Sequence, residues 1–270
     1  MTIRKKIAIL ASDEPHHQYL IDLMLSNFNI VAIVIEPMKE QRLRRLKNKQ
    51  YINYLYYLYH QIRRELLGLN HYRSRYFQDS RSTSLDNEVQ TLEVPWINDA
   101  KVEETLKNAE PDLTVVIGTS ILKRNVLEVA GDNIINLHGG YLPYYRGNHC
   151  FFFAIYNEEL DKIGSTIHFV DSGIDTGNII ELVVPPIKSE DFQSALSVAE
   201  ILYCRAEKLA IHRLIEWVKY WENGGELPRY SQGLRGNLYK TRDRQPYHDL
   251  ILWLRKLRGK LQPKKQCLAK

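Results

Sequence analysis

The sequence predicts an α/β protein with a Rossmann-like, open and mostly parallel sheet, helices on both faces of that sheet, and a short C-terminal extension. Three observations support this fold class. Short runs rich in β-branched residues alternate with amphipathic segments of helical length. Several of these runs are apolar throughout, as strands covered on both faces are. The length, 270 residues, suits one large domain with an appendage.

The first half of the chain contains the predicted parallel strands. Four apolar runs have the length of strands: residues 7–10, 30–35, 112–118 and 133–137. The amphipathic segment 16–28 separates the first two runs and predicts a helix. A second helix is expected over residues 120–129, between the last two runs. Strand, helix and strand in this order are the opening of a parallel sheet.

The pattern changes after residue 138. Residues 164–170 and 179–184 show the alternation and β-branching of strands. Between them, residues 171–177 contain two glycines and two aspartates and predict a structured loop. Apolar residues at helical spacing over residues 194–221 predict a long helix.

Two basic segments lie outside this core. The first, residues 38–80, holds ten Lys/Arg against three Asp/Glu and is helix-like and rich in tyrosine. We interpret it as an insertion into a main domain of residues 1–222. The second segment belongs to a C-terminal extension, residues 223–270, in which a basic amphipathic helix is expected over residues 247–261. We expect both segments to pack on the domain or, in a homodimer, on a second subunit. Contact of the tail with a membrane surface is the less favoured alternative, and no nucleic acid partner is expected.

The composition, 44% hydrophobic and 26% charged residues, is that of an ordinary globular protein. No stretch approaches the roughly 18 uninterrupted apolar residues of a membrane span. The first apolar run is better interpreted as a buried strand than as a signal peptide, so a cytoplasmic location is expected. The three cysteines are an odd number without a Cys-x-x-Cys pair. They argue against a disulfide framework and a zinc site, and we expect no bound metal.

The candidate reactive residues follow the last predicted parallel strand. Asn136 and His138 are two positions apart, so alternation places both side chains on the same side of the strand. They lie at its carboxyl end, the edge where open α/β sheets build their sites. Asp175 lies in a loop that can fold back onto that edge. Taken alone, Asn-x-His at a strand end is more often a capping Asn and a core His.

The ordered motifs around these residues resemble those of formyltransferases that use N10-formyltetrahydrofolate. The matching segments are Asn-Leu-His at 136–138, Leu-Pro-Tyr-Tyr-Arg-Gly at 142–147, Gly-Ser-Thr-Ile-His-Phe-Val-Asp at 164–171 and Asp-Thr-Gly at 175–177. Ile-Gly-Thr-Ser-Ile-Leu at 117–122 resembles that family's folate loop. The resemblance is strong over about residues 109–186 and weak over the first strands. Because several motifs occur in the right order, it is specific.

The resemblance implies a formyltransferase enzyme with Asn136, His138 and Asp175 as the catalytic residues. When an amine attacks the formyl carbon, negative charge collects on the carbonyl oxygen, and the Asn136 amide can donate to it, a contact worth roughly 3 kcal/mol when well placed. His138 can take or give a proton near neutral pH. Asp175 can relay a proton through water.

The resemblance also implies which molecule donates the formyl group and which residues bind it. The expected formyl donor and only cofactor is N10-formyltetrahydrofolate. Its expected binding residues are Ser120, Ile121, Leu122, Asp171, Gly173 and Ile174. Residues expected on the acceptor side are Tyr141, Arg146 and Asn148. Three structural alternatives stay open: Asp171 can shape the loop, Arg146 can pair with a local carboxylate, and His168 can hold the loop in place.

The run Arg-Gly-Asn-His-Cys-Phe-Phe-Phe-Ala-Ile-Tyr-Asn-Glu at 146–158 is most similar to bacterial sugar N-formyltransferases. These enzymes formylate an amino group on a nucleotide-linked deoxysugar destined for surface polysaccharide, such as the O-antigen of lipopolysaccharide. Methionyl-tRNA formyltransferases usually have Ala-Ala-Pro at the position of residues 148–150, and they carry a C-terminal domain for which the segment after residue 225 is too short. Glycinamide ribonucleotide formyltransferases have His-Pro-Ser where residues 138–140 are His-Gly-Gly. We therefore expect an amino-sugar acceptor.

Other functions stay open as alternatives. The acceptor can be methionyl-tRNA, glycinamide ribonucleotide or a hydroxyornithine-type amine, and the chain can be a non-catalytic module that binds folate or a nucleotide. A Rossmann oxidoreductase shares the opening strand, helix and strand. It is excluded because residues 7–14 lack a glycine-rich phosphate turn.

Overall fold

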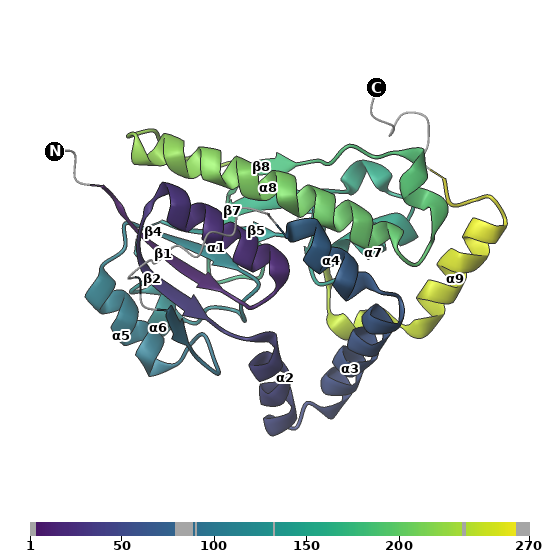
Figure 1. Ribbon diagram of the computed structural model, residues 1–270, viewed down its shortest axis with the longest axis horizontal. Helices are drawn as coiled ribbons and strands as arrows, with labels where there is room; N and C mark the ends of the chain where they lie inside the picture. Colours follow the sequence, from purple (N-terminus) through teal and green to yellow (C-terminus); the bar gives the residue numbers. More distant parts are fainter. Residues whose placement is uncertain (1–3, 79–88, 90, 132, 234–235, 263–270) are drawn as a thin grey trace.

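The computed structural model describes residues 4–78, 89, 91–131, 133–233 and 236–262. A seven-stranded sheet in the order β3-β2-β1-β4-β5-β7-β8 forms the centre of the molecule (Figure 1). Its strands are β1 (Lys6–Ala11), β2 (Asn29–Ile35), β3 (Thr91–Glu93), β4 (Leu113–Ile117), β5 (Ile134–His138), β7 (Ser165–Phe169) and β8 (Ile179–Val183). The predicted fold class, an open and mostly parallel α/β sheet, is confirmed.

The sheet changes direction at β5. The pairs β2–β3, β1–β2, β1–β4 and β4–β5 are parallel, whereas β5–β7 and β7–β8 are antiparallel. This is the point where the continuous apolar runs of the sequence give way to alternating ones. The edge strand β8 is partly exposed, as antiparallel edge strands can be, whereas β7 is buried along its whole length. The carboxyl end of β5 therefore lies beside the beginning of β7, with His138 opposite Thr166.

Helices cover both faces of the sheet (Figure 1). One face carries α1 (Pro15–Asn27) and α8 (Val198–Glu222), and the other carries α5 (Ala100–Ala109) and α6 (Arg124–Leu127). Strand β1 shows how the layers are joined. Its residues Ile7 and Ile9 enter the cluster under α1 and α8, while Ala8 and Leu10 enter the cluster under α5 and α6. All four are fully buried, so this strand is apolar throughout.

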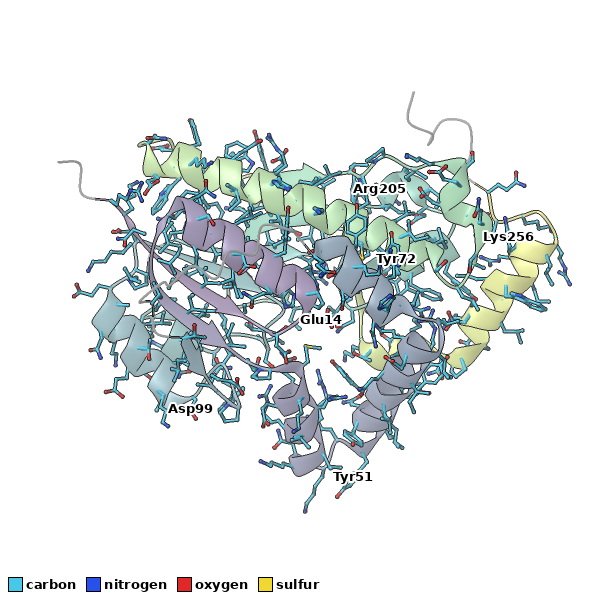
Figure 2. The ribbon with its side chains drawn as sticks, in the orientation of Figure 1. Glu14, Tyr51, Tyr72, Asp99, Arg205 and Lys256 are labelled. Atoms are coloured by element: carbon cyan, nitrogen blue, oxygen red, sulfur yellow. The ribbon has the colours of Figure 1, made fainter. Side chains whose placement is uncertain are left out.

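The basic insertion forms three helices, α2 (Met38–Lys47), α3 (Tyr51–Leu66) and α4 (Leu69–Phe77). Its predicted last residues, 79–80, lie outside the described residues. Helix α4 packs on α1 and α8, and α2 and α3 extend from the body below it (Figure 1). Figure 2 shows Tyr51 at the outer end of α3, and Glu14 at the start of α1 close to α4. The carboxylate of Glu14 pairs there with Arg73 of α4.

The C-terminal extension returns to the body. Its strand β9 (Asn237–Tyr239) pairs in parallel with β6 (Tyr145–Gly147), and a helix, α9 (Pro246–Leu257), follows. Tyr239 stacks on Phe153 of α7 (Cys150–Tyr156), with ring centroids 4.0 Å apart. Short 3-10 helices occur at Leu160–Lys162, Ser189–Gln193 and Thr241–Asp243. Among the described residues, no helix is long and apolar enough to cross a membrane.

The prediction of a helix over residues 120–129 is wrong for most of its length. Only Arg124–Leu127 is helical, and residues 118–123 form a loop. Side chains from elsewhere occupy the backbone groups that a helix would use. Asn98 donates to the carbonyl of Ile121 (3.0 Å) and accepts from the amide of Lys123 (2.5 Å). The carboxylate of Glu36 accepts from the amide of Ser120 (2.7 Å).

Candidate active site

The structure brings Asn136, His138 and Asp175 together. Asn136 and His138 project from the carboxyl end of β5, and Asp175 lies in the loop between β7 and β8. His138 Nδ1 is 3.6 Å from Asp175 Oδ2, and the side chains of the two residues are only 8% and 14% exposed. With His168 they form a group that we call the catalytic edge: Asn136, His138, His168 and Asp175.

The backbone holds Asp175 in a left-handed conformation, with φ of +53°. Its Oδ2 accepts a hydrogen bond from the amide of Gly147 (2.8 Å), and its carbonyl accepts one from Gln232 Nε2 (3.2 Å). Gly177 is required beside it, because a Cβ at that position would lie 1.9 Å from the carbonyl oxygen of Phe169. These contacts aim the carboxylate at β5 despite a backbone conformation that is unfavourable for Asp.

Asp171 shapes the same loop. Its Oδ1 accepts from the amide of Gly173 (3.0 Å) and from the hydroxyl of Thr176 (2.6 Å). This is the Asx-type turn by which Asp replaces backbone hydrogen bonds in irregular segments. The structural interpretation of Asp171 therefore has two direct contacts in its favour.

His168 fixes the orientation of the Asn136 amide. His168 Nδ1 lies 2.7 Å from the carbonyl oxygen of Phe169, so Nδ1 must carry a hydrogen. In the neutral ring Nε2 is then an acceptor, and the group 3.0 Å from it must be the NH₂ of Asn136. Burial lowers the pKa of His168 to about 4, so the ring is neutral at physiological pH. The sequence left open that His168 holds the loop; its Nε2 contacts Asn136 directly and also lies 3.8 Å from Asp175 Oδ1 in that loop.

His138 makes contacts that leave one ring nitrogen facing Asp175. Its Nε2 lies 3.2 Å from the carbonyl oxygen of Tyr145 and 3.7 Å from Cys150 Sγ. Burial raises the pKa of the Cys150 thiol well above its usual value, so this sulfur is a neutral neighbour and not a nucleophile. The 3.6 Å between His138 and Asp175 exceeds a direct hydrogen bond and is suited to a proton relay through water or to closure on ligand binding.

The catalytic edge opens into a cleft of about 1030 Å³. All six residues expected to bind the folate line this cleft: Ser120, Ile121, Leu122, Asp171, Gly173 and Ile174. Of the residues expected on the acceptor side, Asn148 lines it, whereas Tyr141 and Arg146 do not. The Arg146 guanidinium instead donates to the carbonyls of Ile174 (3.5 Å) and Gly236 (3.3 Å). Arg146 thus connects the Asp175 loop to the C-terminal extension.

The cleft is also strongly basic. Eight described Lys/Arg residues line it against five Asp/Glu, so the cavity suits an anionic ligand. Most of the arginines come from the insertion. Three arginines of the insertion and one of the extension form a group that we call the basic wall: Arg63, Arg64, Arg73 and Arg244. The sequence showed that the insertion is basic but did not identify these residues as part of a site.

The basic wall is held by acids from other elements. Glu200 of α8 accepts from Arg64 (2.6 Å) and from Arg73 (2.7 Å). Although burial raises the pKa of Glu200, the two guanidinium charges and their hydrogen bonds bring it down to about 2. Asp249 of α9 accepts from Arg63 (3.0 Å) and Arg244 (2.6 Å). Insertion, α8 and extension are therefore joined by buried ion pairs.

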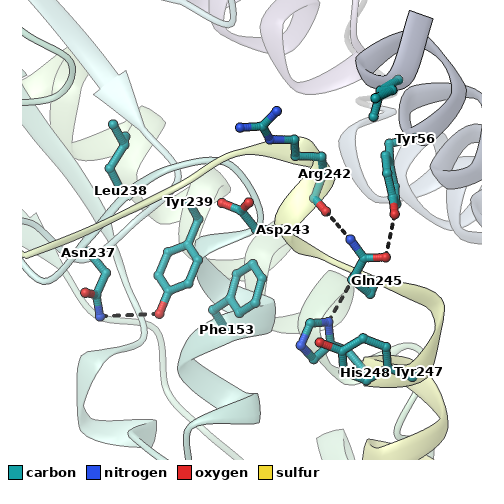
Figure 3. A pocket seen from close by; sticks show the side chains of 11 residues that line it. Tyr56, Phe153, Asn237, Leu238, Tyr239, Arg242, Asp243, Gln245, Tyr247 and His248 are labelled. Carbon is teal, nitrogen blue, oxygen red and sulfur yellow. Dashed lines mark hydrogen bonds between the residues drawn. The ribbon is translucent and has the colours of Figure 1, made fainter.

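A second hollow of about 750 Å³ lies between α3 and the extension (Figure 3). Tyr56, Tyr239, Gln245 and other residues line it, and none of the catalytic-edge residues does. The segment 241–245 separates the two cavities. Within it, Thr241 and Arg244 line the cleft, whereas Arg242, Asp243 and Gln245 line the hollow.

A family model described as "Formyl transferase" matches residues 5–200. The chain belongs to the formyl transferase family. Among curated relatives, it is 31% identical over 153 residues to a methionyl-tRNA formyltransferase of Methylacidiphilum infernorum, a match that covers 56% of this chain and 45% of the relative. The chain therefore spans less than half the length of that relative.

Two solved structures of family members share the fold. One is a 4-N formyltransferase from Francisella tularensis (TM-score 0.56, 18% identity, 93% of this chain and 87% of that one). The other is an N-formyltransferase from Helicobacter canadensis in complex with folinic acid and dTDP-3-aminofucose (TM-score 0.56, 17% identity, 88% of this chain and 72% of that one). At these identities the likeness shows the fold, and the function has to be argued from the cleft itself.

Proposed function

We propose that this protein transfers the formyl group of N10-formyltetrahydrofolate to the amino group of a nucleotide-linked amino sugar for surface polysaccharide. One observation favours this function above all. A single cleft is lined by Asn136, His138 and Asp175 and by an excess of basic side chains. A nucleotide-linked amino sugar has the matching chemistry, because it carries an amine to be formylated and phosphates to be neutralised.

The residues expected to bind the folate offer apolar surface to a flat pterin ring. Ile121 and Ile174 line the cleft with 59% and 36% of their surface exposed, which leaves apolar side chains available to cover a ring. Gly118, at φ of +69°, turns the chain into the loop, and its backbone packs so closely on His17 that a Cβ would lie 2.1 Å from the ring. A formyltetrahydrofolate bound there would supply the electrophilic formyl carbon.

In the proposed reaction, Asn136 stabilises the charge that develops on the formyl oxygen. One N–H of its amide is directed at His168 Nε2, which fixes the plane of the amide group. The amide has a second N–H, available to the substrate oxygen. Because the amide is oriented before the reaction, the stabilisation needs no reorganisation when the charge appears.

His138 and Asp175 handle the proton. As the new C–N bond forms, the attacking nitrogen loses a proton to this pair, and a proton is returned to the departing nitrogen as the old C–N bond breaks. The product amide and the released amine therefore balance the reaction without another reactant. The carboxylate of Asp175 is held by Gly147 on one side and faces His138 on the other, which suits the relay.

Methionyl-tRNA is the second candidate acceptor. The curated relative that is 31% identical carries that name. A tRNA ligand is also anionic, and so it would also suit a basic cleft. The two acceptors differ in size, however, and the arginines of the basic wall are buried and paired with Glu200 and Asp249, which favours a small ligand inside the cleft over a large one outside it.

A formyl-transfer assay with a panel of acceptors tests the proposal. The panel contains nucleotide-linked amino sugars, methionyl-tRNA and glycinamide ribonucleotide, with N10-formyltetrahydrofolate as donor and His138→Asn as the inactive control. We expect transfer to at least one nucleotide-linked sugar. Transfer to methionyl-tRNA alone would disprove the sugar assignment. If the wild-type protein does not bind a folate analogue in a titration, the enzyme assignment itself is wrong.

A further inference from the structure

Four side chains from distant parts of the chain meet on the acceptor side of the cleft. His60 and Arg63 come from α3, His149 precedes α7, and Arg244 belongs to the extension. All four line the cleft. The rings of His60 and His149 are 4.5 Å apart, and His60 Nε2 lies 3.2 Å from the carbonyl oxygen of Thr241. Insertion, body and extension thus converge at one point.

Each of these side chains has a buried nitrogen without a hydrogen-bond partner among the described residues. The atoms are His60 Nδ1, Arg63 Nε, His149 Nε2 and Arg244 Nε. Buried polar atoms in folded proteins are nearly always paired, so several unpaired nitrogens in one cluster are unusual. The side chains of Arg63 and Arg244 are only 10% and 7% exposed. The cluster is therefore built into the wall and is not a pair of surface arginines.

The local charge is not balanced. The hydrogen bonds that Arg63 and Arg244 donate to Asp249 both leave from Nη2 and end on the same oxygen, Oδ1. One carboxylate thus serves two guanidinium groups. Burial, and next the charge of Arg63, lower the pKa of Arg244 to about 10. Burial lowers the pKa of His149 well below its usual value, with smaller contributions from the charges of Arg244 and His60. An anion at this point would relieve the repulsion between like charges.

The cluster lies next to the catalytic edge in the sequence and in space. His149 is followed by Cys150, whose Sγ is 3.7 Å from His138 Nε2. A ligand that places its amine at His138 and extends along the cleft past residue 149 therefore reaches the cluster. The folate-loop residues 118–123 have basic neighbours of their own, since Arg44 pairs with Glu36 beside Ser120. Arg44 belongs to α2, whereas Arg63 belongs to α3 and Arg244 to the extension.

We propose that Arg63, His149 and Arg244, supported by His60, bind a phosphate group of the acceptor and so set the distance between that phosphate and the amine that is formylated. The proposal rests on the proposed function, because it assigns the acceptor end of the same cleft. Arginine suits this task, since its planar guanidinium binds a phosphate through paired hydrogen bonds.

Titration calorimetry with phosphate probes tests the assignment without formyl transfer. The full chain is titrated with dTDP, UDP and inorganic pyrophosphate, and separately with 5-formyltetrahydrofolate. The variants are Arg244→Lys and His149→Gln. Arg244→Lys keeps a positive charge near Asp249, and if one substitution disturbs folding, the other still tests the site. Arg242→Gln is the matched control, since Arg242 lies on the same turn but faces the second hollow. Thermal unfolding confirms that each variant is folded.

We expect each cleft variant to bind dTDP, UDP and pyrophosphate about tenfold or more weakly than the wild type, the cost of losing one charge-assisted hydrogen bond. The affinity for 5-formyltetrahydrofolate and the phosphate affinities of Arg242→Gln should stay within about twofold of wild type. A loss for the nucleotides without a loss for pyrophosphate would overturn the phosphate assignment, as would wild-type affinity in folded cleft variants. So would a wild-type protein that binds none of the three probes.

The outcome also separates this proposal from the proposed function. If the phosphate probes bind and the cleft variants weaken them, the phosphate site stands whatever the transfer assay shows. If the same protein then formylates only an amine without a phosphate, the proposed function is wrong while the phosphate site remains.

Discussion

The catalytic edge and the basic wall, two groups of side chains that line the cleft, differ in how they hold buried polar atoms. The catalytic edge consists of side chains on or beside two adjacent strands, and its His168 is neutral at physiological pH. The basic wall consists of ionised side chains on helices and the extension, each held by a carboxylate from another element. The catalytic edge depends on the direction of its hydrogen bonds, and the basic wall depends on the pairing of opposite charges. Orientation matters where bonds are made and broken, whereas charge matters where an anion is held.

Two glutamates on α8 show the same difference on a single helix. Glu200 lies against the basic wall, and its pKa is lowered to about 2 because Arg73 and Arg64 offset the burial that raises it. Glu207, two turns further on, lies under Gly139 near the catalytic edge. Burial raises its pKa to about 7, and its hydrogen bond is with the hydroxyl of Ser165 (2.6 Å). The partner, and not the depth of burial, decides which form of the acid is stable.

The largest expected effect concerns the catalytic edge. His138→Asn and Asp175→Asn should each lower kcat by about a thousandfold, because each removes one member of the proton relay. Neither should change the free energy of unfolding by much, since Asn is similar in size and polar. Steady-state kinetics and urea unfolding measure the two quantities. Turnover near the wild-type rate in either folded variant would show that the relay is assigned to the wrong residues.

The two glutamates provide a matched pair for stability. Glu207→Gln should raise the free energy of unfolding by about 3 kcal/mol at pH 8, since a pKa raised to about 7 makes the acid costly once it ionises. This gain should shrink as the pH falls through 7 and vanish below about pH 4, where the folded and unfolded acids are both largely protonated. Glu200→Gln should have the opposite effect, because the ionised Glu200 stabilises the fold. The substitution should lower the free energy of unfolding by about 3 kcal/mol at pH 7, and this loss should disappear as the pH falls toward 2.

Urea unfolding at several pH values measures both variants. If the change in the free energy of unfolding depended on pH in the same way for both variants, the contrast between a buried acid with an ion pair and one without would be wrong. Glu200→Gln also serves as the control for Glu207→Gln, because both substitutions remove one carboxylate from the same helix.

The smallest expected effect concerns orientation. His168→Phe removes the acceptor that fixes the Asn136 amide and should lower kcat about tenfold, about 1.4 kcal/mol, with KM unchanged. His168→Gln retains an acceptor oxygen and should recover part of the loss. A change in KM instead of kcat would show that His168 acts on substrate binding, and an equal loss in both variants would show that it acts only through packing.

The sequence predicted six of the seven strands of the sheet because each of the six is a local pattern, whereas the three-residue β3 was not predicted. It also predicted the meeting of Asn136, His138 and Asp175, since a strand end and a loop only two strands away define them. The helix expected over residues 120–129 failed because Asn98, from more than twenty residues upstream, takes the backbone groups of that loop. No local pattern encodes such a contact.

The basic wall was beyond sequence reasoning for the same reason, on a larger scale. Arg64 and Glu200 are 136 residues apart, and Arg63 and Asp249 are 186 apart. The charge of residues 38–80 showed that arginines were present, but not that they turn inward. The position of His168 beside Asn136 could have been predicted, because His168 lies on a strand that pairs with β5. The direction of the hydrogen bond between the two side chains could not have been predicted.

The ion pairs of Asp249 bear on how this cleft can be altered. Arg63 belongs to a segment inserted between the second and third strands, and Asp249 to the last described helix. A chimera with an insertion that lacks Arg63 still leaves Asp249 paired with Arg244. An insertion that also lacks Arg64 and Arg73 leaves the buried Glu200 of α8 without either guanidinium, a defect of about 3–5 kcal/mol. A replacement insertion therefore has to supply the arginines that pair with Glu200, or α8 has to be exchanged with it.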